Sequence, residues 1–255
     1  MVLAKRSGTR KKWKNLAVYV LNLDRSPERM KRMTAKLKRL GLPFKRIVAV
    51  DGKTARFTRR ECDERKYELA VGKKTTPTEI GCFVSHYNTL SEFLDSSSAE
   101  FALVMEDDMD FADDFSAMLG ALLARGDWDM VKLNGRHGGG YVWRSRLAGR
   151  YDLVKNLFHQ SDCGAYVMNK KAARSYVGGL YPMFVPIDHE FVKFWKYGLR
   201  GFCVDPFPTR SEGSRSTIDY AALRAGRRPW YRKLPTALYK SFIALRRAVY
   251  VVSGK

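Results

Sequence analysis

The stretch Leu16-Ala-Val-Tyr-Val-Leu-Asn-Leu23 decides the fold of this chain, because it is a short, continuous apolar run rich in residues that favour β-strands. The residues after it predict a helix, with Ser26 as its N-cap, Pro27 at its first position and Gly41 as its C-terminal stop. A second strand is expected over residues 44–50. A strand–helix–strand unit of this kind normally makes a right-handed crossover between parallel strands.

The same alternation continues along the chain. We expect a helix over residues 78–94, a buried strand over 101–105, a helix over 115–125 and another strand over 130–133. With 255 residues, of which 45% are hydrophobic, the chain is long enough to bury one large core. The pattern therefore predicts an α/β fold with a mostly parallel central sheet and helices on both of its faces.

The charge of the chain is concentrated at its two ends. The formal net charge is +21, from 47 Lys+Arg and 26 Asp+Glu. Six basic residues and no acidic residue precede Asp24, and nine basic residues and no acidic residue follow Asp219. We therefore divide the chain into a basic N-terminal arm (1–15), a central domain (16–220) and a basic C-terminal tail (221–255). A field of this sign attracts nucleic acid, an anionic membrane surface or phosphorylated substrates.

The tail has an amphipathic helical pattern. Its apolar residues recur on one helical face: Leu238, Phe242, Leu245, Val249 and Val252. Lys240, Arg246 and Arg247 fall away from that face. This composition is typical of a helix that lies in a membrane interface, and a terminal helix packed on the domain is the alternative.

Cysteine spacing and hydropathy bear on the compartment. The four cysteines, Cys62, Cys82, Cys163 and Cys203, lie far apart and form no CxxC pair. We expect reduced, buried thiols rather than a disulfide framework or a structural zinc site. The basic N-terminus is not followed by the apolar stretch of a secretory signal, and no window approaches the ~18 apolar residues of a membrane span. These observations predict a cytoplasmic protein.

Three carboxylates, Glu106-Asp107-Asp108, directly follow the buried strand over residues 101–105. Open α/β sheets bind their ligands at the carboxyl ends of the strands. Like charges this close repel one another unless a cation neutralises them, and oxygen-rich clusters suit Mg²⁺ or Mn²⁺. If the strand continued, Glu106 and Asp108 would point the same way and hold a metal together. A solvated acidic turn is the alternative.

Four blocks of sequence occur in a fixed order: Val20–Arg29, Ala49–Gly52, Thr78–His86 and Val104–Asp108. Weaker matches follow at Gly164–Tyr166, Pro186–Asp188, Pro206 and Ser216–Ile218. Together, over roughly residues 16–220, they resemble glycosyltransferase family 25, the enzymes of lipopolysaccharide and lipooligosaccharide assembly related to collagen galactosyltransferases. The resemblance implies a GT-A type nucleotide-sugar-binding fold in a catalytic domain over 16–220, with an Asp-x-Asp-like metal motif.

The resemblance also implies a UDP-sugar donor and a Mn²⁺ or Mg²⁺ ion. Asp108 would be the direct metal ligand, and Glu106 a second ligand or a contact to the ribose. Asn22 and Arg25 are expected beside the uridine diphosphate, and Asp51 is placed to accept hydrogen bonds from the uridine. An exposed arginine near a helix start and a plain Asp-Gly turn are the alternatives for Arg25 and Asp51.

Further site residues follow from the resemblance. Glu79, Ser85 and His86 lie on one expected helix and are assigned to donor binding. His86 would contact phosphate or the acceptor; a satisfied structural histidine is the alternative, and a zinc role is not expected without further ligands. Asp188 is the candidate catalytic base of an inverting transfer, for which its pKa would have to be raised or the proton would have to be lost late. Capping of a helix that begins near His189 is the alternative for Asp188.

These features predict a metal-dependent transferase that moves a hexose, galactose from UDP-galactose, onto a lipid-linked oligosaccharide. The basic ends would hold it on anionic lipid at the inner face of the cytoplasmic membrane. One rival is a basic nucleic-acid-binding protein, but no nucleic-acid-binding motif occurs, so nucleic acid is not expected as a partner. Another is a non-catalytic family member that acts as a binding or assembly factor. A metal-dependent phosphohydrolase is a third, although four histidines supply no histidine-rich second metal site.

Overall fold

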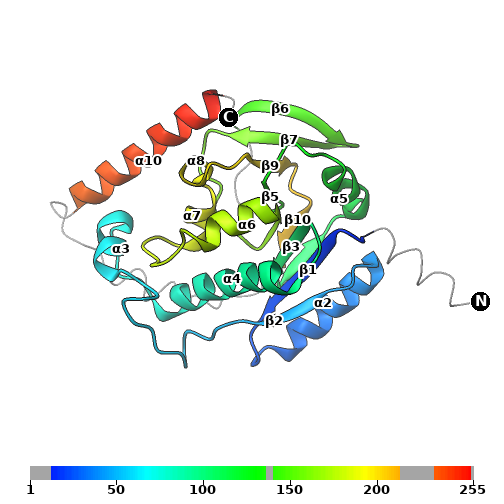
Figure 1. Cartoon of the computed structure of the whole chain (residues 1–255), viewed down its shortest axis with the longest axis horizontal. Coiled ribbons are helices and arrows are strands. Elements are labelled where there is room, and N and C mark those ends of the chain that lie inside the picture. The colour runs from blue at the N-terminus through cyan, green and yellow to red at the C-terminus, as the bar shows by residue number, and fades with distance from the viewer. Residues whose placement is uncertain (1–12, 136–139, 213–232, 254–255) are drawn as a thin grey trace, which may run out of the picture.

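The computed structural model describes residues 13–135, 140–212 and 233–253, so the block Ser216–Ile218 lies outside the described residues. Within these ranges, eight strands form one sheet in the order β2-β1-β3-β8-β5-β9-β7-β6 (Figure 1). The strands of this sheet are β1 (Leu16–Asn22), β2 (Lys45–Val48), β3 (Phe101–Glu106), β5 (Met130–Lys132), β6 (Tyr141–Ala148), β7 (Tyr151–Asn156), β8 (Ala165–Asn169) and β9 (Gly201–Asp205). Two short strands, β4 (Met109–Phe111) and β10 (Thr209–Ser211), pair separately as an antiparallel ribbon.

Helices cover both faces of the sheet, as the sequence predicts (Figure 1). Their bounds are α2 (Pro27–Leu40), α3 (Glu64–Val71), α4 (Pro77–Ser96), α5 (Phe115–Leu123), α6 (Lys170–Val177), α7 (Ile187–Phe191), α8 (Phe194–Tyr197) and α10 (Leu234–Val252). One core lies under α4 and α6 and contains Phe83 and Tyr19. The other lies under α2 and α5 and contains Leu37, Leu119 and Val20. Successive residues of β1 thus enter opposite cores, because side chains alternate along a strand.

The predicted strand–helix–strand unit is confirmed, since β1 pairs in parallel with β2 and also with β3. The sheet as a whole is mixed, because β8 pairs antiparallel with both β3 and β5. The parallel strands β2, β1 and β3 end at one edge of the sheet, and the antiparallel β8 begins at that same edge. There the backbone N–H of Glu106 donates to the carbonyl of Gly164 at 2.8 Å. The α/β fold class is confirmed, and this edge collects segments from both halves of the chain.

The folded domain begins at Trp13 or before it, upstream of the predicted start at residue 16. The Trp13 side chain is only 5% exposed and belongs to the core under α2. The carbonyl of Asn15 also accepts a hydrogen bond from the N–H of Phe101 at 3.0 Å. Residues 13–15 are therefore part of the domain and not of a basic arm; the rest of the predicted arm, residues 1–12, lies outside the described residues.

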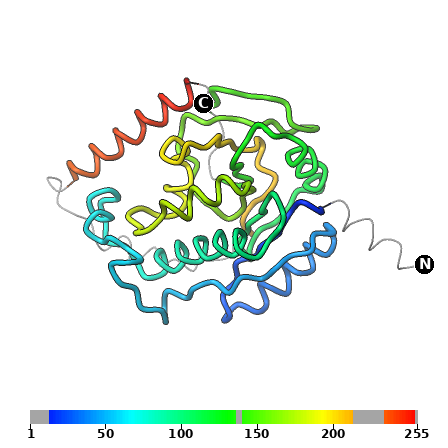
Figure 2. The backbone as a smooth tube through the Cα atoms, viewed as in Figure 1, coloured from blue at the N-terminus to red at the C-terminus, as the bar shows by residue number. Residues whose placement is uncertain are grey.

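The C-terminal helix α10 packs one face on the domain. Thr236 Oγ1 donates to the carbonyl of Leu69 at 2.9 Å. Tyr250 Oη donates to the carbonyl of Leu199 at 2.8 Å and accepts from the N–H of Gly201 at 2.9 Å. Figure 2 shows the helix running from the neighbourhood of α3 to the side of β6. These contacts agree with the alternative interpretation of the tail, a terminal helix packed on the domain.

The opposite face of α10 carries a stripe of exposed apolar side chains, which we call the α10 stripe. It consists of Leu234, Leu238, Phe242, Leu245, Val249 and Val252. The predicted face is thus exposed, and its use as a membrane contact stays a prediction. Among the described residues, no helix combines the length and apolar character needed to cross a bilayer.

The backbone of helix α4 is in direct contact with the backbone of the loop that follows β2. A Cβ atom at Gly81 would lie 2.6 Å from the carbonyl oxygen of Val50, and one at Gly52 would lie 2.2 Å from that of Pro77. Ser85 Oγ accepts from the N–H of Val50 at 2.8 Å and donates to the carbonyl of Gly81 at 2.6 Å. Both glycines are required, because any side chain would hold the helix and the loop apart.

We expect Gly81→Ala to lower the free energy of unfolding by about 1–3 kcal/mol, since the added methyl group meets backbone atoms that have little room to move. Gly120→Ala is the matched control: Gly120 is also helical, and nothing lies within 4 Å of its added Cβ. That variant should be neutral or stabilised by about 0.5–1 kcal/mol, because alanine favours a helix. Urea unfolding followed by circular dichroism measures both. Equal effects of the two substitutions would contradict the close approach.

Candidate functional site

A pocket opens at the edge where β1, β2 and β3 end, against the first turns of α4. Several of the residues that the sequence predicts for the site line it: Arg25, Asp51, Ser85, His86 and Glu106. The position agrees with the rule that open α/β sheets bind ligands beyond the carboxyl ends of their strands.

Arg25 and Asp51 meet each other at the rim of the pocket. Arg25 Nε donates to Asp51 Oδ2 at 2.5 Å, and Asp51 Oδ1 accepts from the N–H of Lys53 at 3.0 Å. The Lys53 N–H and the Arg25 guanidinium lower the pKa of Asp51. The sequence predicts these side chains as separate contacts to phosphate and uridine. In the structure they form an ion pair, so a nucleotide would have to bind the pair or open it.

Asn22 lies behind the pocket and not in its lining. It is only 2% exposed, and its amide donates to Asp107 Oδ2 at 2.6 Å and to the carbonyl of Ser26 at 3.0 Å. Its Oδ1 atom accepts from Arg46 Nε at 2.9 Å. Because every polar atom of this side chain is occupied by the protein, Asn22 orients Asp107. A direct contact of Asn22 with the uridine diphosphate stays a prediction, and in this structure its partners are protein groups.

Arg29 is a site residue that the sequence analysis does not assign, although it lies within the block Val20–Arg29. Its Nη1 atom lies 3.1 Å from Asp107 Oδ1 and 3.7 Å from Asp108 Oδ2, and its side chain lines the pocket. The guanidinium thus brings positive charge to an edge that otherwise carries several carboxylates. A signal in the sequence is its position in the first turn of α2, directly after β1, where a basic side chain lies at the edge at which the strands end.

Glu79 has a structural role at the start of α4. Its Oε2 atom accepts from the N–H of Thr76 at 3.0 Å, and the N–H of Glu79 donates to Thr76 Oγ1 at 3.2 Å, which is a capping box. Its Oε1 atom accepts from Tyr67 Oη at 3.0 Å and from Lys73 Nζ at 2.8 Å. The expectation that Glu79 binds the donor is not supported, because its carboxylate is fully engaged away from the pocket. Ser85 lines the pocket while it also holds Val50.

The acidic triplet does not continue the strand. β3 ends at Glu106, and Asp107 and Asp108 form a turn. The predicted alternation, with Glu106 and Asp108 pointing the same way, is therefore wrong, because alternation applies only within a strand. Glu106 Oε1 lies 3.7 Å from His86 Nε2, whereas Asp107 and Asp108 face Arg29. The three carboxylates thus face two partners: Glu106 faces His86, and the two aspartates face Arg29.

Asp108 has the character of a hard cation ligand. Burial first, and then the charges of Glu106, Asp107 and Asp162, raise its pKa to about 6 against the opposing effect of Arg29. A carboxylate that is disfavoured as an anion by its neighbours gains from a bound divalent cation. The oxygen donors present here suit Mg²⁺ or Mn²⁺. Whether Asp108 and Glu106 share such an ion stays a prediction.

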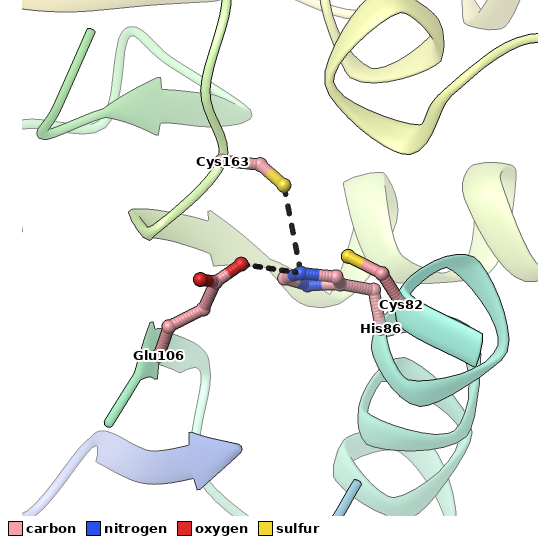
Figure 3. Close-up of side chains that lie close together, drawn as sticks. All are labelled: Cys82, His86, Glu106 and Cys163. Carbon is pink, nitrogen blue, oxygen red and sulfur yellow. Dashed lines mark hydrogen bonds and ion pairs between the residues drawn. The ribbon is translucent and has the colours of Figure 1, made fainter. Parts of the chain in front are cut away.

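Helix α4 also brings Cys82 and His86 into the pocket wall beside Glu106 and Cys163 (Figure 3). One ligand-type atom from each of these four residues lies within 4.8 Å of the others. His86 is completely buried; its Nδ1 atom lies 2.9 Å from Tyr166 Oη and its Nε2 atom 3.5 Å from Cys163 Sγ. The assumption that His86 has no further ligand-type neighbours is wrong, because the fold brings together residues that are far apart in sequence.

The side chains of this cluster shift one another's pKa values. Burial lowers the pKa of His86, but Cys82 and Glu106 outweigh burial and raise it to about 9. A hydrogen bond with Cys163 lowers the pKa of the Cys82 thiol to about 7, with a further contribution from His86. The pKa of Cys163 is raised well above its ordinary value by the hydrogen bond with Cys82. Cys82 is half-buried and lines the pocket, so it is not a buried thiol of the kind expected from the sequence.

Asp188 lies in the first turn of α7, outside the lining of the pocket. Its Oδ2 atom accepts from the N–H of Asp162 and its Oδ1 atom from the N–H of His189, both at 3.0 Å. Burial raises the pKa of Asp188, but His189, the Asp162 N–H and Lys132 lower it overall. This direction is opposite to the one that a strong base requires. The predicted capping role is also wrong, because the N-cap position is Pro186.

A buried lysine fixes the loop that carries Asp162 and Cys163. Lys132 is completely buried on β5, and its Nζ atom donates to the backbone carbonyls of Gln160 at 2.5 Å and of Asp162. An ammonium group in this position is stable only with such partners. The loop is therefore tied to the centre of the sheet before it enters β8.

A family model described as Glycosyltransferase family 25 (LPS biosynthesis protein) matches residues 15–191. Procollagen galactosyltransferase 1 of Danio rerio is 33% identical over 79% of this chain and 37% of its own length. Procollagen galactosyltransferase 1-B of Xenopus laevis is 27% identical over the same shares. A Bos taurus relative named probable inactive glycosyltransferase 25 family member 3 is 25% identical over 77% of this chain and 37% of its own length.

The chain thus spans little more than a third, 37%, of the length of these relatives. A solved structure, mannose-1-phosphate geranyltransferase from Thermus thermophilus, aligns with 77% of this chain and 76% of its own. Its sequence identity is 12% and its TM-score 0.35, which is too low to compare the folds in detail.

We expect Asn22→Ala to lower the free energy of unfolding by about 1–3 kcal/mol, because it leaves buried hydrogen-bonding groups without partners. Arg25→Ala is the control at the pocket rim, where loss of a partly exposed ion pair should cost less than about 1 kcal/mol. Urea unfolding measures both. If the Asn22→Ala protein were as stable as the unaltered protein but bound nucleotide more weakly, Asn22 would be a donor-binding residue and not a structural one.

Proposed function

The chain belongs to glycosyltransferase family 25, and from this premise we propose that it transfers a hexose, galactose from UDP-galactose, to a lipid-linked oligosaccharide of the lipopolysaccharide or lipooligosaccharide type. The donor sugar is supported by the names of the procollagen galactosyltransferases to which the chain is similar. The acceptor class is supported by the family description.

The observation that carries the proposal is the composition of the pocket at the edge of the sheet. Arg25 and Arg29 contribute guanidinium groups, which recognise phosphate oxygens well. Asp51, on the same rim, offers a carboxylate that stays ionised and can accept hydrogen bonds from a nucleoside. A nucleoside diphosphate needs both kinds of group within one pocket.

Asp108 is the proposed ligand of a Mn²⁺ or Mg²⁺ ion, with Glu106 as the second candidate ligand. A divalent cation there would neutralise charge on the departing diphosphate. Asp108 suits such an ion because burial and the nearby carboxylates raise its pKa and so favour a cation beside it. Arg29, 3.7 Å from Asp108 Oδ2, would add a positive charge on the same side.

Asp188 is the proposed acceptor of the hydroxyl proton in an inverting transfer. Its lowered pKa makes it a weak base, so the proton would move only late, when the new bond to the sugar is already forming. The hydrogen bond from Asp162 holds its carboxylate in place. His86, completely buried, is better suited to shaping the pocket wall than to contacting the acceptor.

We further propose that the α10 stripe attaches the enzyme to an anionic membrane surface at its cytoplasmic face. The stripe is apolar and exposed, while Lys240 and Arg246 on the same helix are also exposed. Basic residues near an anionic surface contribute about 1 kcal/mol each.

We expect the protein to bind and turn over UDP-galactose in the presence of Mn²⁺. Asp108→Asn should reduce turnover at least about 100-fold, equivalent to about 2.7 kcal/mol of transition-state stabilisation. Asp110→Asn is the matched control, because Asp110 lies on β4 and is paired with Lys36 and Arg210. In the same assay, Asp188→Asn should lower turnover while the KM for the donor stays unchanged.

Absence of binding and turnover for every UDP-hexose tested, with Mn²⁺ present and the protein folded, would overturn the transferase proposal. It would favour the non-catalytic alternative, for which the relative named as probably inactive is a precedent.

We expect Phe242→Glu to weaken sedimentation with phosphatidylglycerol-containing vesicles about tenfold or more, because a charge replaces apolar surface that the membrane would bury. Ala237→Glu is the control, since Ala237 is exposed on the same helix but lies outside the stripe. The difference in binding between anionic and zwitterionic vesicles measures the electrostatic contribution to membrane binding. Equal binding of both variants would show that the α10 stripe is not the membrane contact.

A further inference from the structure

Four side chains of metal-ligand type, from three separate segments, converge at the wall of the pocket; Cys82, His86 and Glu106 line the pocket, and Cys163 lies behind them (Figure 3). Cys82 and His86 lie one turn apart on α4, Glu106 ends β3, and Cys163 lies just before β8. One donor atom from each lies within 4.8 Å of the others. Helical spacing brings Cys82 and His86 together, whereas their approach to Glu106 and Cys163 depends on α4 lying against the edge at which β3 ends and β8 begins.

Two of the donor-to-donor distances suit a tetrahedral ion. Bonds of about 2.3 Å to sulfur and about 2.05 Å to nitrogen place those two atoms about 3.6 Å apart in a tetrahedral zinc site, and nitrogen and oxygen about 3.4 Å apart. The Sγ atom of Cys163 lies 3.5 Å from His86 Nε2. The Oε1 atom of Glu106 lies 3.7 Å from the same nitrogen. Both separations are close to edges of such a tetrahedron.

The surroundings of His86 also resemble those of a metal ligand. Its Nδ1 atom lies 2.9 Å from the hydroxyl of Tyr166, which is itself completely buried. A metal-bound histidine commonly uses its second ring nitrogen to hydrogen-bond an oxygen, which fixes the ring. Phe191 packs edge-on against the imidazole, with ring centroids 5.9 Å apart. The ring is thereby held with Nε2 directed toward Cys163 and Glu106.

We propose that Cys82, His86, Cys163 and Glu106 bind one zinc-class divalent cation. Two thiolates and an imidazole select this class of ion, whereas Mg²⁺ and Mn²⁺ prefer oxygen donors such as Asp108. The ion joins α4, the end of β3 and the loop before β8, and so fixes the wall of the pocket. Binding releases the thiol protons to solvent. The side chain of Glu106 is 37% exposed, which leaves the carboxylate on the side of the pocket.

The test is a titration of the full chain with Co²⁺, a spectroscopic substitute for zinc, followed by competition with Zn²⁺. We expect one Co²⁺ per chain with thiolate-to-metal charge-transfer absorption, displaced by Zn²⁺. Cys82→Ser and Cys163→Ser should each weaken binding at least about tenfold and reduce the absorption. Cys203→Ser is the matched control, since Cys203 is a buried free cysteine on β9 outside the cluster. Asp108→Asn should keep one Co²⁺ per chain with thiolate-to-metal absorption, because Asp108 is not a ligand of this site, which separates the site from the proposed transferase metal.

A second measurement needs no variant that might fail to fold. Zn²⁺ should slow alkylation of Cys82 and Cys163 in the unaltered protein, as mapped by mass spectrometry, and leave the rates of Cys62 and Cys203 unchanged. The proposal is overturned if excess Co²⁺ gives no thiolate absorption, or if Zn²⁺ protects all four cysteines equally. Isolation of the folded protein with a Cys82–Cys163 disulfide that persists without oxidant would also overturn it.

Discussion

The site depends on the close approach of helix α4 to the loop that follows β2. Gly52 and Gly81 allow the two backbones to touch, and Ser85 fastens the contact by bonding to Val50 on one side and to its own helix on the other. A helix held at this distance presents each following turn to the edge of the sheet. Cys82 and His86 therefore reach the pocket wall because Gly81 on the helix and Gly52 in the loop have no side chains that would hold α4 away.

Much of the architecture follows from local patterns in the sequence. β1, α2 and α4 are continuous apolar or amphipathic segments with clear start and stop residues, so their types and approximate bounds could be predicted. The pocket could also be placed, because parallel strands end together. The pairing of β8 could not be predicted, since its antiparallel direction depends on contacts with β3 and β5 far away in sequence.

The individual site residues were harder to assign than the site itself. A polar residue at the end of a strand can face a ligand or support its neighbour, and only its partners decide between the two. Asn22 and Glu79 have their polar atoms occupied by the protein, while Arg29, which pairs with two carboxylates, faces the pocket. The predicted common direction of Glu106 and Asp108 is wrong for a different reason. The strand ends at Glu106 and a turn follows, so the alternation of side chains along a strand no longer applies.

Glu106 belongs electrostatically to two clusters. Its carboxylate lies 3.7 Å from the imidazole of His86, and its charge also raises the pKa of Asp108. A cation bound to the cysteines and His86 would offset the negative charge of Glu106. The repulsion between Glu106 and Asp108 would then be weaker. A cation beside Asp108 would in turn reduce the attraction of Glu106 for the other cluster. Because coupling between two binding sites is reciprocal, the wall of the pocket and its proposed metal ligand cannot be tuned independently while Glu106 lies between them.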